Sequence, residues 1–224
     1  MVFSFLIINI SNLIAFEDKA PAGTVYGIDN KTKVPLAPGI PFYIDSPEEL
    51  QKWSKNNLPI PKGIVSLYVP IFSQNNFTWK NNKMKTCNLT IGGYGCALTS
   101  SAMVFKYYGA TKQNPGQLNM CLDKNACPLY WSIAANSCSE KKVTYVGAWT
   151  FSYKKLYDML SISRPPIIKI IKSNNSHFVV IISGSGNQPK DYWINDPWDG
   201  KSKQLSAYTN NGWTPNAIYE FSKQ

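Results

Sequence analysis

The stretch from Gly92 to Gly109 constrains this chain more than any other, because three glycines within four positions lead directly into Cys96. Glycine adopts backbone conformations that other residues avoid, so this run predicts a tight turn. Beyond the turn, apolar residues recur at steps of three and four, and Gly109 stands where a helix commonly ends. The pattern therefore predicts a helix that begins at Cys96. Its buried stripe consists of Leu98, Ala102 and Phe105.

Cys96 is a candidate nucleophile, because a helix N-terminus favours the reactive thiolate of a cysteine placed there. A buried structural thiol is the alternative. The chain has five cysteines, so one thiol remains if the others pair as disulfides. We expect Cys96 to be that thiol, and three pairings are open to Cys87, Cys121, Cys127 and Cys138. With one histidine and no Cys-x-x-Cys pair in the sequence, we predict no metal and no cofactor.

Composition divides the chain into three segments. Residues 1–15 are apolar and uncharged, and we predict a signal peptide there, with a buried strand or a misplaced start codon as the alternatives. Residues 16–62 contain seven prolines and balanced charges, which predicts an arm with one short helix beginning near Pro47. Residues 63–224 form the predicted main domain. Because paired cysteines suit an oxidising compartment, we expect a secreted or cell-envelope protein.

The net charge of +10 comes from the main domain, which holds 17 Lys and Arg against 7 Asp and Glu. Such a surface attracts anionic partners in general. The lysines are scattered, however, and they neither share a helix face nor alternate with aromatic residues. We therefore predict a solvated lysine surface and no nucleic-acid partner.

The main domain reads as an α+β fold, with helices first and antiparallel strands last. After the Cys96 helix, residues 110–148 carry three of the other four cysteines, and an amphipathic helix is expected near Phe151–Leu160. β-Branched and apolar runs predict strands on both sides of these helices. The predicted strands are residues 64–69, 166–171, 177–183, 192–195 and 217–221.

A cysteine nucleophile needs a base, a group that orients the base, and donors for the oxyanion. His177 opens a predicted strand and is the candidate base. Asp196 ends the next strand and is the candidate orienting group, with the carboxamide of Asn195 as the alternative. Gln74 lies in the loop before the helix and is the candidate oxyanion donor. Each of these residues also has an ordinary structural explanation.

These residues occur within an ordered set of short motifs. The motifs are Ser73-Gln74 with Trp79, Thr90-Ile91, Gly95-Cys96, Ala102-Met103, Tyr108-Gly109, Pro166-Ile167-Ile168, His177-Phe178-Val179-Val180 and Asn195-Asp196-Pro197-Trp198. The set resembles the double-glycine leader peptidases and their secreted relatives, which form cysteine peptidase family thirty-nine in the papain-like clan. The resemblance covers Val69 to Phe221.

The resemblance implies that Cys96 is the nucleophile, His177 the base, Asp196 the orienting group and Gln74 the oxyanion donor. It also implies a papain-like fold, in which a helix carrying the cysteine packs on an antiparallel sheet carrying the histidine and the aspartate. Gln74 lies 22 residues before Cys96, a longer spacing than in the transporter-fused members of the family.

The expected function is that of a papain-like peptidase that hydrolyses peptide amide bonds through a Cys-His-Asp triad and an acyl-enzyme. Its expected partner is a peptide or protein substrate, wall-associated peptides included. An acyl-transferring enzyme of the transglutaminase or transpeptidase kind is one alternative, and an inactive peptide-binding domain is another. The sequence predicts no integral membrane domain and no ATP-binding cassette, so coupling to bacteriocin export is not expected.

Overall fold

The computed structural model describes residues 26–28, 33–35 and 63–224. The predicted signal peptide of residues 1–15 and the predicted helix near Pro47 lie outside these residues. Within the predicted arm, β1 (Tyr26–Ile28) and β2 (Lys33–Pro35) pair as a two-stranded antiparallel sheet.

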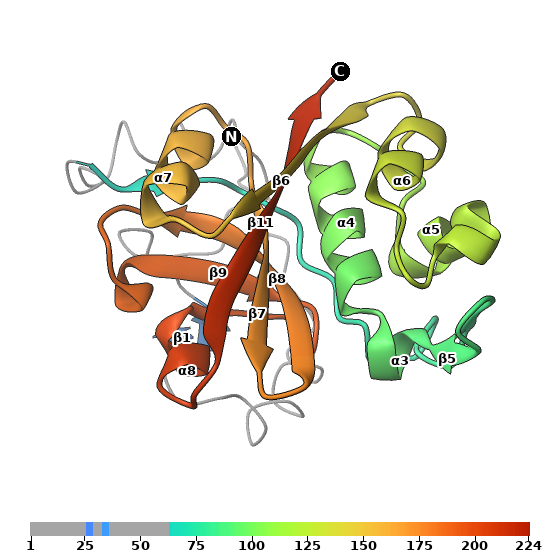
Figure 1. Cartoon of the computed structure of the whole chain (residues 1–224), viewed down its shortest axis with the longest axis horizontal. Helices are drawn as coiled ribbons and strands as arrows, with labels where there is room; N and C mark the ends of the chain where they lie inside the picture. Colours follow the sequence, from blue (N-terminus) through green and yellow to red (C-terminus); the bar gives the residue numbers. More distant parts are fainter. Residues whose placement is uncertain (1–25, 29–32, 36–62) are drawn as a thin grey trace.

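The main domain is built on one antiparallel sheet with the strand order β10-β9-β8-β7-β11-β6, and β3 pairs with β8 beside that path (Figure 1). Four of the strands confirm predicted ones, whereas β6 and β10 were not predicted. The predicted strand of residues 64–69 is reduced to the two residues of β3. The bounds are β3 Val65–Ser66, β6 Val143–Thr150, β7 Ile167–Lys172, β8 Asn175–Gly184, β9 Tyr192–Asp196, β10 Lys201–Gln204 and β11 Thr214–Lys223.

Helices cover both faces of the sheet, with α4, α5 and α6 on one side and α7 on the other (Figure 1). The Cys96 helix and the amphipathic helix near Phe151–Leu160 are confirmed as α4 and α7. Two helices, α5 and α6, occupy the cysteine-bearing stretch for which no elements were predicted. The bounds are α3 Ile91–Tyr94, α4 Cys96–Tyr107, α5 Pro115–Leu122, α6 Trp131–Cys138, α7 Tyr153–Ser161 and α8 Ser206–Thr209. A short hairpin of β4 (Lys83–Met84) and β5 (Leu89–Thr90) precedes α3, and two 3-10 turns are Asp123–Asn125 and Pro189–Asp191.

The central strand β8 shows why the sheet can be covered on both faces. Successive side chains of a strand point to opposite faces. Val180 and Ile182 belong to the core under α4, α5 and α6, whereas Val179 and Ile181 belong to the core under α7. A strand buried on both faces loses the polar alternation of a half-exposed strand, which explains its continuous apolar sequence. The result is an α+β fold with a papain-like arrangement of helix and sheet.

Two disulfides tie the helical side together. Cys87 is bonded to Cys127, and Cys121 is bonded to Cys138. Cys96 is the free cysteine, so the expectation of four oxidised cysteines and one thiol is confirmed. In the part of the chain that the structure describes, no helix is long and apolar enough to cross a membrane.

Candidate active site

The glycine turn sets the position of Cys96. The short helix α3 ends at Gly95, which is also the N-cap residue of α4. A Cβ atom on Gly95 would lie 2.6 Å from the carbonyl oxygen of Ile91, a distance that side-chain carbons do not tolerate, so this close approach requires glycine. Cys96 is consequently the first residue of a 12-residue helix, where the first backbone N–H groups have no helical acceptor and the dipole favours an anion.

His177 brings an imidazole from the sheet to this helix terminus. It lies on β8, opposite Ile170 of β7, and its side chain is buried. The ring nitrogen Nε2 lies 2.8 Å from Oδ1 of Asp196, and the Cys96 side chain lies near enough to the ring to raise its pKa. Because Asp196 engages Nε2, Nδ1 is the nitrogen left for Cys96. The structure therefore brings three of the predicted site residues into one chain of contacts.

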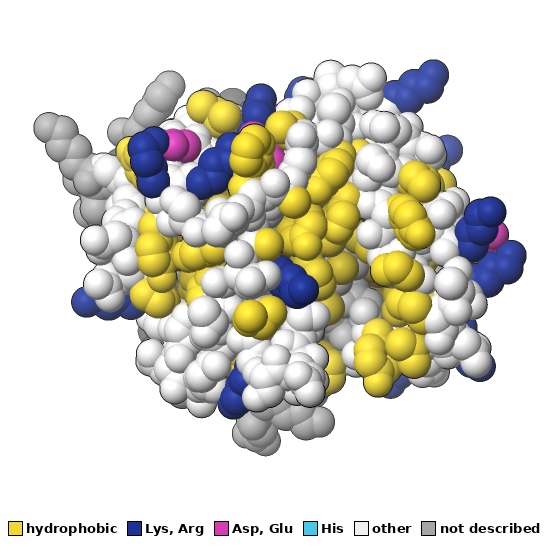
Figure 2. Space-filling model, in the orientation of Figure 1, with side chains coloured by type: hydrophobic (Ala, Val, Ile, Leu, Met, Phe, Trp, Pro, Cys, Tyr) yellow, Lys and Arg dark blue, Asp and Glu magenta, His cyan; other side chains and the backbone are white. Residues whose placement is uncertain are grey.

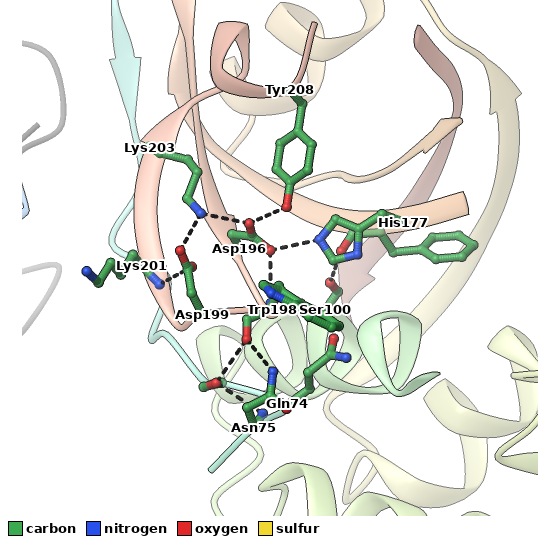
Figure 3. A network of polar contacts seen from close by, with 12 residues as sticks. Gln74, Asn75, Ser100, His177, Asp196, Trp198, Asp199, Lys201, Lys203 and Tyr208 are labelled. Carbon is green, nitrogen blue, oxygen red and sulfur yellow. Dashed lines mark hydrogen bonds and ion pairs between the residues drawn. The ribbon is translucent and has the colours of Figure 1, made fainter. Parts of the chain in front are cut away.

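Asp196 is fully buried, and both of its carboxylate oxygens are satisfied (Figure 3). Oδ1 accepts hydrogen bonds from His177 and from the backbone N–H of Trp198, the latter at 2.9 Å. Oδ2 is paired with the ammonium of Lys203 at 2.9 Å and accepts a hydrogen bond from the hydroxyl of Tyr208. These four contacts come from three different elements and a turn, so they fix the orientation of the carboxylate.

The electrostatics of the cluster favour a charged Asp196 and a charged His177. Burial alone would raise the pKa of Asp196, but the Lys203 ammonium and then the His177 ring hold that pKa well below its usual range. Burial alone would lower the pKa of His177, but the Asp196 carboxylate and then the Cys96 side chain more than offset it and raise the pKa to about 10. Near neutral pH the ring is therefore an imidazolium beside the cysteine.

Gln74 reaches the same site despite its long spacing from Cys96. Its side chain is buried and lines the same cavity as Cys96 and His177. Nε2 donates a hydrogen bond to the carbonyl oxygen of Gly92 at 2.8 Å, and the backbone N–H of Gln74 donates to the carbonyl oxygen of Pro197. The β4–β5 hairpin lies between Gln74 and α3, and these extra residues account for the spacing.

Asn195 is not brought to His177. Its Nδ2 donates to the carbonyl oxygen of Val69 at 2.8 Å, and its Oδ1 accepts a hydrogen bond from the Ser202 hydroxyl at 2.6 Å. Adjacent residues of a strand face opposite sides of the sheet, so Asn195 and Asp196 cannot both point at the same ring. The carboxamide instead anchors the segment that leads to Gln74.

A cleft of about 690 Å³ opens over Cys96, between the helical side and the sheet. Its walls are mostly apolar, and among the described residues that line it none is Lys, Arg, Asp or Glu. Figure 2 shows hydrophobic side chains gathered in the middle of this face, where the helices meet the sheet. The principal side chains of the walls are Leu98, Leu129, Trp131, Phe178, Tyr208 and Trp213.

Sequence reasoning missed Lys203, Asp199 and Tyr208, which surround the carboxylate of Asp196. Lys203 lies in a polar run, Lys201 to Gln204, that reads as an exposed edge strand. The structure buries Lys203 completely, 2.6 Å from the Asp199 carboxylate. The single available signal was the four-residue spacing of Asp199 and Lys203, which is common on any surface. No three His, Cys, Asp or Glu residues gather as metal ligands within the described ranges.

Comparison with known proteins gives one family. The family model described as "Peptidase_C39 like family" matches residues 66–219. This range contains Gln74, Cys96, His177 and Asp196, and it agrees with the span over which the motifs resemble that family. The search of curated proteins returned no match to the chain.

Proposed function

The chain belongs to the Peptidase_C39-like family, and on that premise we propose that it is an active papain-like cysteine peptidase that uses Cys96 as its nucleophile. One observation carries the proposal, namely that Cys96 and His177 line the same apolar cleft and that the His177 ring is hydrogen-bonded to the buried Asp196 behind it. A nucleophile, a base and an oriented carboxylate in mutual contact are the parts that acyl transfer to a thiol requires.

In the proposed reaction, the thiolate of Cys96 attacks the carbonyl carbon of a peptide bond and a tetrahedral oxyanion forms. The imidazolium of His177 then donates its Nδ1 proton to the leaving amine nitrogen, and the C–N bond breaks to give a thioester. Water attacks the thioester while the neutral ring takes its proton, and the C–S bond breaks. The products are the free acid, the thiolate and a reprotonated ring, so the cycle closes.

Two donors are available for the oxyanion. Cys96 is the first residue of α4, so its backbone N–H is one of those without a helical acceptor. The Nε2 group of Gln74 carries two hydrogens, and the carbonyl oxygen of Gly92 accepts one of them. The second hydrogen and the Cys96 N–H are our proposed oxyanion hole. This arrangement stabilises charge that exists in the transition state and not in the substrate.

The location of the protein is proposed on separate grounds. The two disulfides are consistent with an extracellular protein, because they persist where the environment is oxidising. Secretion through a signal peptide at residues 1–15 remains a prediction. The proposed substrate is a peptide or a protein, and a wall-associated peptide fits an envelope location.

The proposal is tested by alkylating the native full-length protein with iodoacetamide at mildly acidic pH and measuring intact mass. Wild-type Cys96 should react far faster than free cysteine, because its sulfur lies at a helix N-terminus and close to the His177 ring. His177→Ala should reduce the rate to that of an ordinary thiol, and Cys96→Ala should take up no fast label. Equal rates for wild type and His177→Ala would mean that His177 is only a structural residue. Amine trapping of the acyl group then separates transfer from hydrolysis.

A further inference from the structure

Lys203 is a fully buried lysine that lies between two carboxylates. Its Nζ atom is 2.9 Å from Oδ2 of Asp196 and 2.6 Å from Oδ2 of Asp199, and its side chain has no exposed surface. Figure 3 shows the ammonium bridging the two aspartates. Burying an ammonium without a partner costs several kcal/mol, and Asp199 alone would satisfy that need. The second contact is the one that matters, because it is made to the carboxylate that holds His177.

The chain after Asp196 folds back to make this contact. It turns at residues 197–200 and returns as β10, which pairs antiparallel with β9 so that Lys201 lies opposite Asp196. Lys203 lies two residues further along β10 and extends diagonally to the carboxylate. The next helix, α8, supplies Tyr208, whose hydroxyl binds the same oxygen. Residues 197–209 therefore enclose the side of Asp196 that faces away from His177.

We propose that Lys203 is a positioning residue of the peptidase reaction, which holds the Asp196 carboxylate in place and shares its negative charge so that His177 can release its proton. The proposal rests on the proposed function. A carboxylate paired with imidazolium alone would hold the ring proton tightly, and the ring would then be a poor acid toward the leaving amine. An ammonium on the other oxygen takes up part of that charge.

The charged and titratable groups around Asp196 and His177 support the direction of this effect, namely that Lys203 weakens the hold of His177 on its proton. Cys96 from α4, Asp196 from β9 and Tyr208 from α8 face the ring, and Lys203 from β10 and Asp199 from the turn face the carboxylate. Burial and the Asp196 charge raise the pKa of Tyr208, and burial followed by the Asp196 charge raises the pKa of Asp199, so neither group supplies a positive charge. Lys203, whose Nζ lies 2.9 Å from the carboxylate, is thus a cation that opposes protonation of His177 from this side.

The experiment measures the titration of His177 by NMR in the full-length protein. Because His177 is the one histidine of the sequence, its ring signals need no assignment by mutation. Lys203→Met should raise the pH midpoint of the ring by about half a unit or more, a roughly threefold tighter hold on the proton, because a nearby positive charge is lost. Lys155→Met is the matched control, since it removes an ion-paired lysine whose partner is Glu220. Its midpoint should equal that of wild type.

A folded Lys203→Met protein with the wild-type midpoint would overturn the proposal and make Lys203 purely structural. Should Lys203→Met fail to fold, the double variant Lys203→Met/Asp199→Asn replaces it. In that variant the carboxylate of Asp199, which would otherwise lose its ion-pair partner Lys203, is removed as well. A smaller upward shift is expected there, and an unchanged midpoint or a second failure to fold would again make Lys203 structural. The midpoint does not depend on turnover. An unreactive wild-type Cys96 would therefore defeat the proposed function without deciding the role of Lys203.

Discussion

The two sides of the cleft are stabilised by different kinds of interaction. The helical side, residues 83–138, carries Cys96 and is cross-linked by two disulfides whose cysteines are 40 and 17 residues apart. The sheet side, residues 143–223, contains no cysteine and instead has ion pairs, among them the buried pair of Lys203 with Asp196 and the partly exposed pair of Arg164 with Glu220. The helical side is thus braced by covalent cross-links, whereas on the sheet side the proposed base, His177, is held and charged by electrostatic contacts. The comparison predicts that substitutions on the two sides have different effects on catalysis, on pH dependence and on stability.

The largest effect is expected from Cys96→Ala, which removes the nucleophile without touching either bracing system. Amide hydrolysis should fall by about 10⁵-fold or more, since loss of a nucleophile is not compensated by the remaining groups. The melting temperature should stay close to that of wild type because the side chain is small and only partly buried. Residual turnover above about one part in a hundred of wild type would show that another group acts as nucleophile.

Asp196→Asn should have the next largest effect, because it removes the buried negative charge that pairs with His177 and Lys203 on the sheet side. The carboxamide still reaches the ring but does not stabilise its charge, so kcat should fall by about 10³- to 10⁴-fold. The carboxylate is the main group that raises the pKa of His177, so the alkaline limb of the activity profile should move to lower pH. Asn195→Ala is the control. Asn195→Ala should lower the melting temperature and leave both limbs of the pH–activity profile in place. An alkaline limb that moved as far as in Asp196→Asn would mean that Asn195 also acts on the His177 ring.

Gln74→Ala tests a residue that belongs to both sides, since it is bonded to Gly92 of the helical side and to Pro197 of the sheet side. We expect kcat to fall by about 10²- to 10³-fold with little change in KM, as for one oxyanion donor. Asn75→Ala, which removes a hydrogen bond to the Trp198 carbonyl oxygen, should change kcat much less. A rise in KM at constant kcat would make Gln74 a substrate contact.

The smallest effect on chemistry is expected from Cys87→Ser/Cys127→Ser, which weakens the covalent side. Loss of this disulfide should lower the free energy of unfolding by about 2–4 kcal/mol. Amide exchange should accelerate in residues 83–138 and not in the sheet, and KM should rise because Cys127 lines the cleft. In Arg164→Met, by contrast, amide exchange should accelerate in the sheet and not in residues 83–138. Uniform acceleration over both sides in either variant would mean that the two sides unfold as one unit.

Sequence patterns predicted the sheet side well where strands are buried on both faces. Residues 178–182, which follow the histidine, are continuously apolar, so β8 could be assigned without knowledge of its partners. The same reasoning missed β6, whose eight residues are mostly exposed and include Gly147 and Trp149. It also missed α5 and α6, because glycine, asparagine and cysteine weaken the helical pattern inside them, and the disulfides and tertiary packing compensate for poor propensity.

For the site, the sequence predicted residue types but not their pairing. Cys96, His177 and Asp196 could be proposed because each chemistry has few candidates in this chain, with one histidine and one unpaired cysteine. The choice between Asp196 and Asn195 required the structure, because the two faces of β9 differ and no pattern shows which residue points to the ring. The role of Lys203 could not be predicted from the sequence, because nothing in a polar run shows that one of its lysines is buried.

Strand β11, Thr214–Lys223, has a consequence for biosynthesis. It is the last of the described elements to leave the ribosome, yet it lies inside the sheet, between β7 and β6. Until these ten residues emerge, β6 lacks the strand that pairs with it, and the Trp131 ring lacks Tyr219, on which it stacks at 4.2 Å. A nascent or stalled chain that ends before Thr214 therefore carries every residue of the candidate triad without a finished cleft wall. The order of synthesis therefore leaves the sheet beside the candidate cleft incomplete until translation has passed β11.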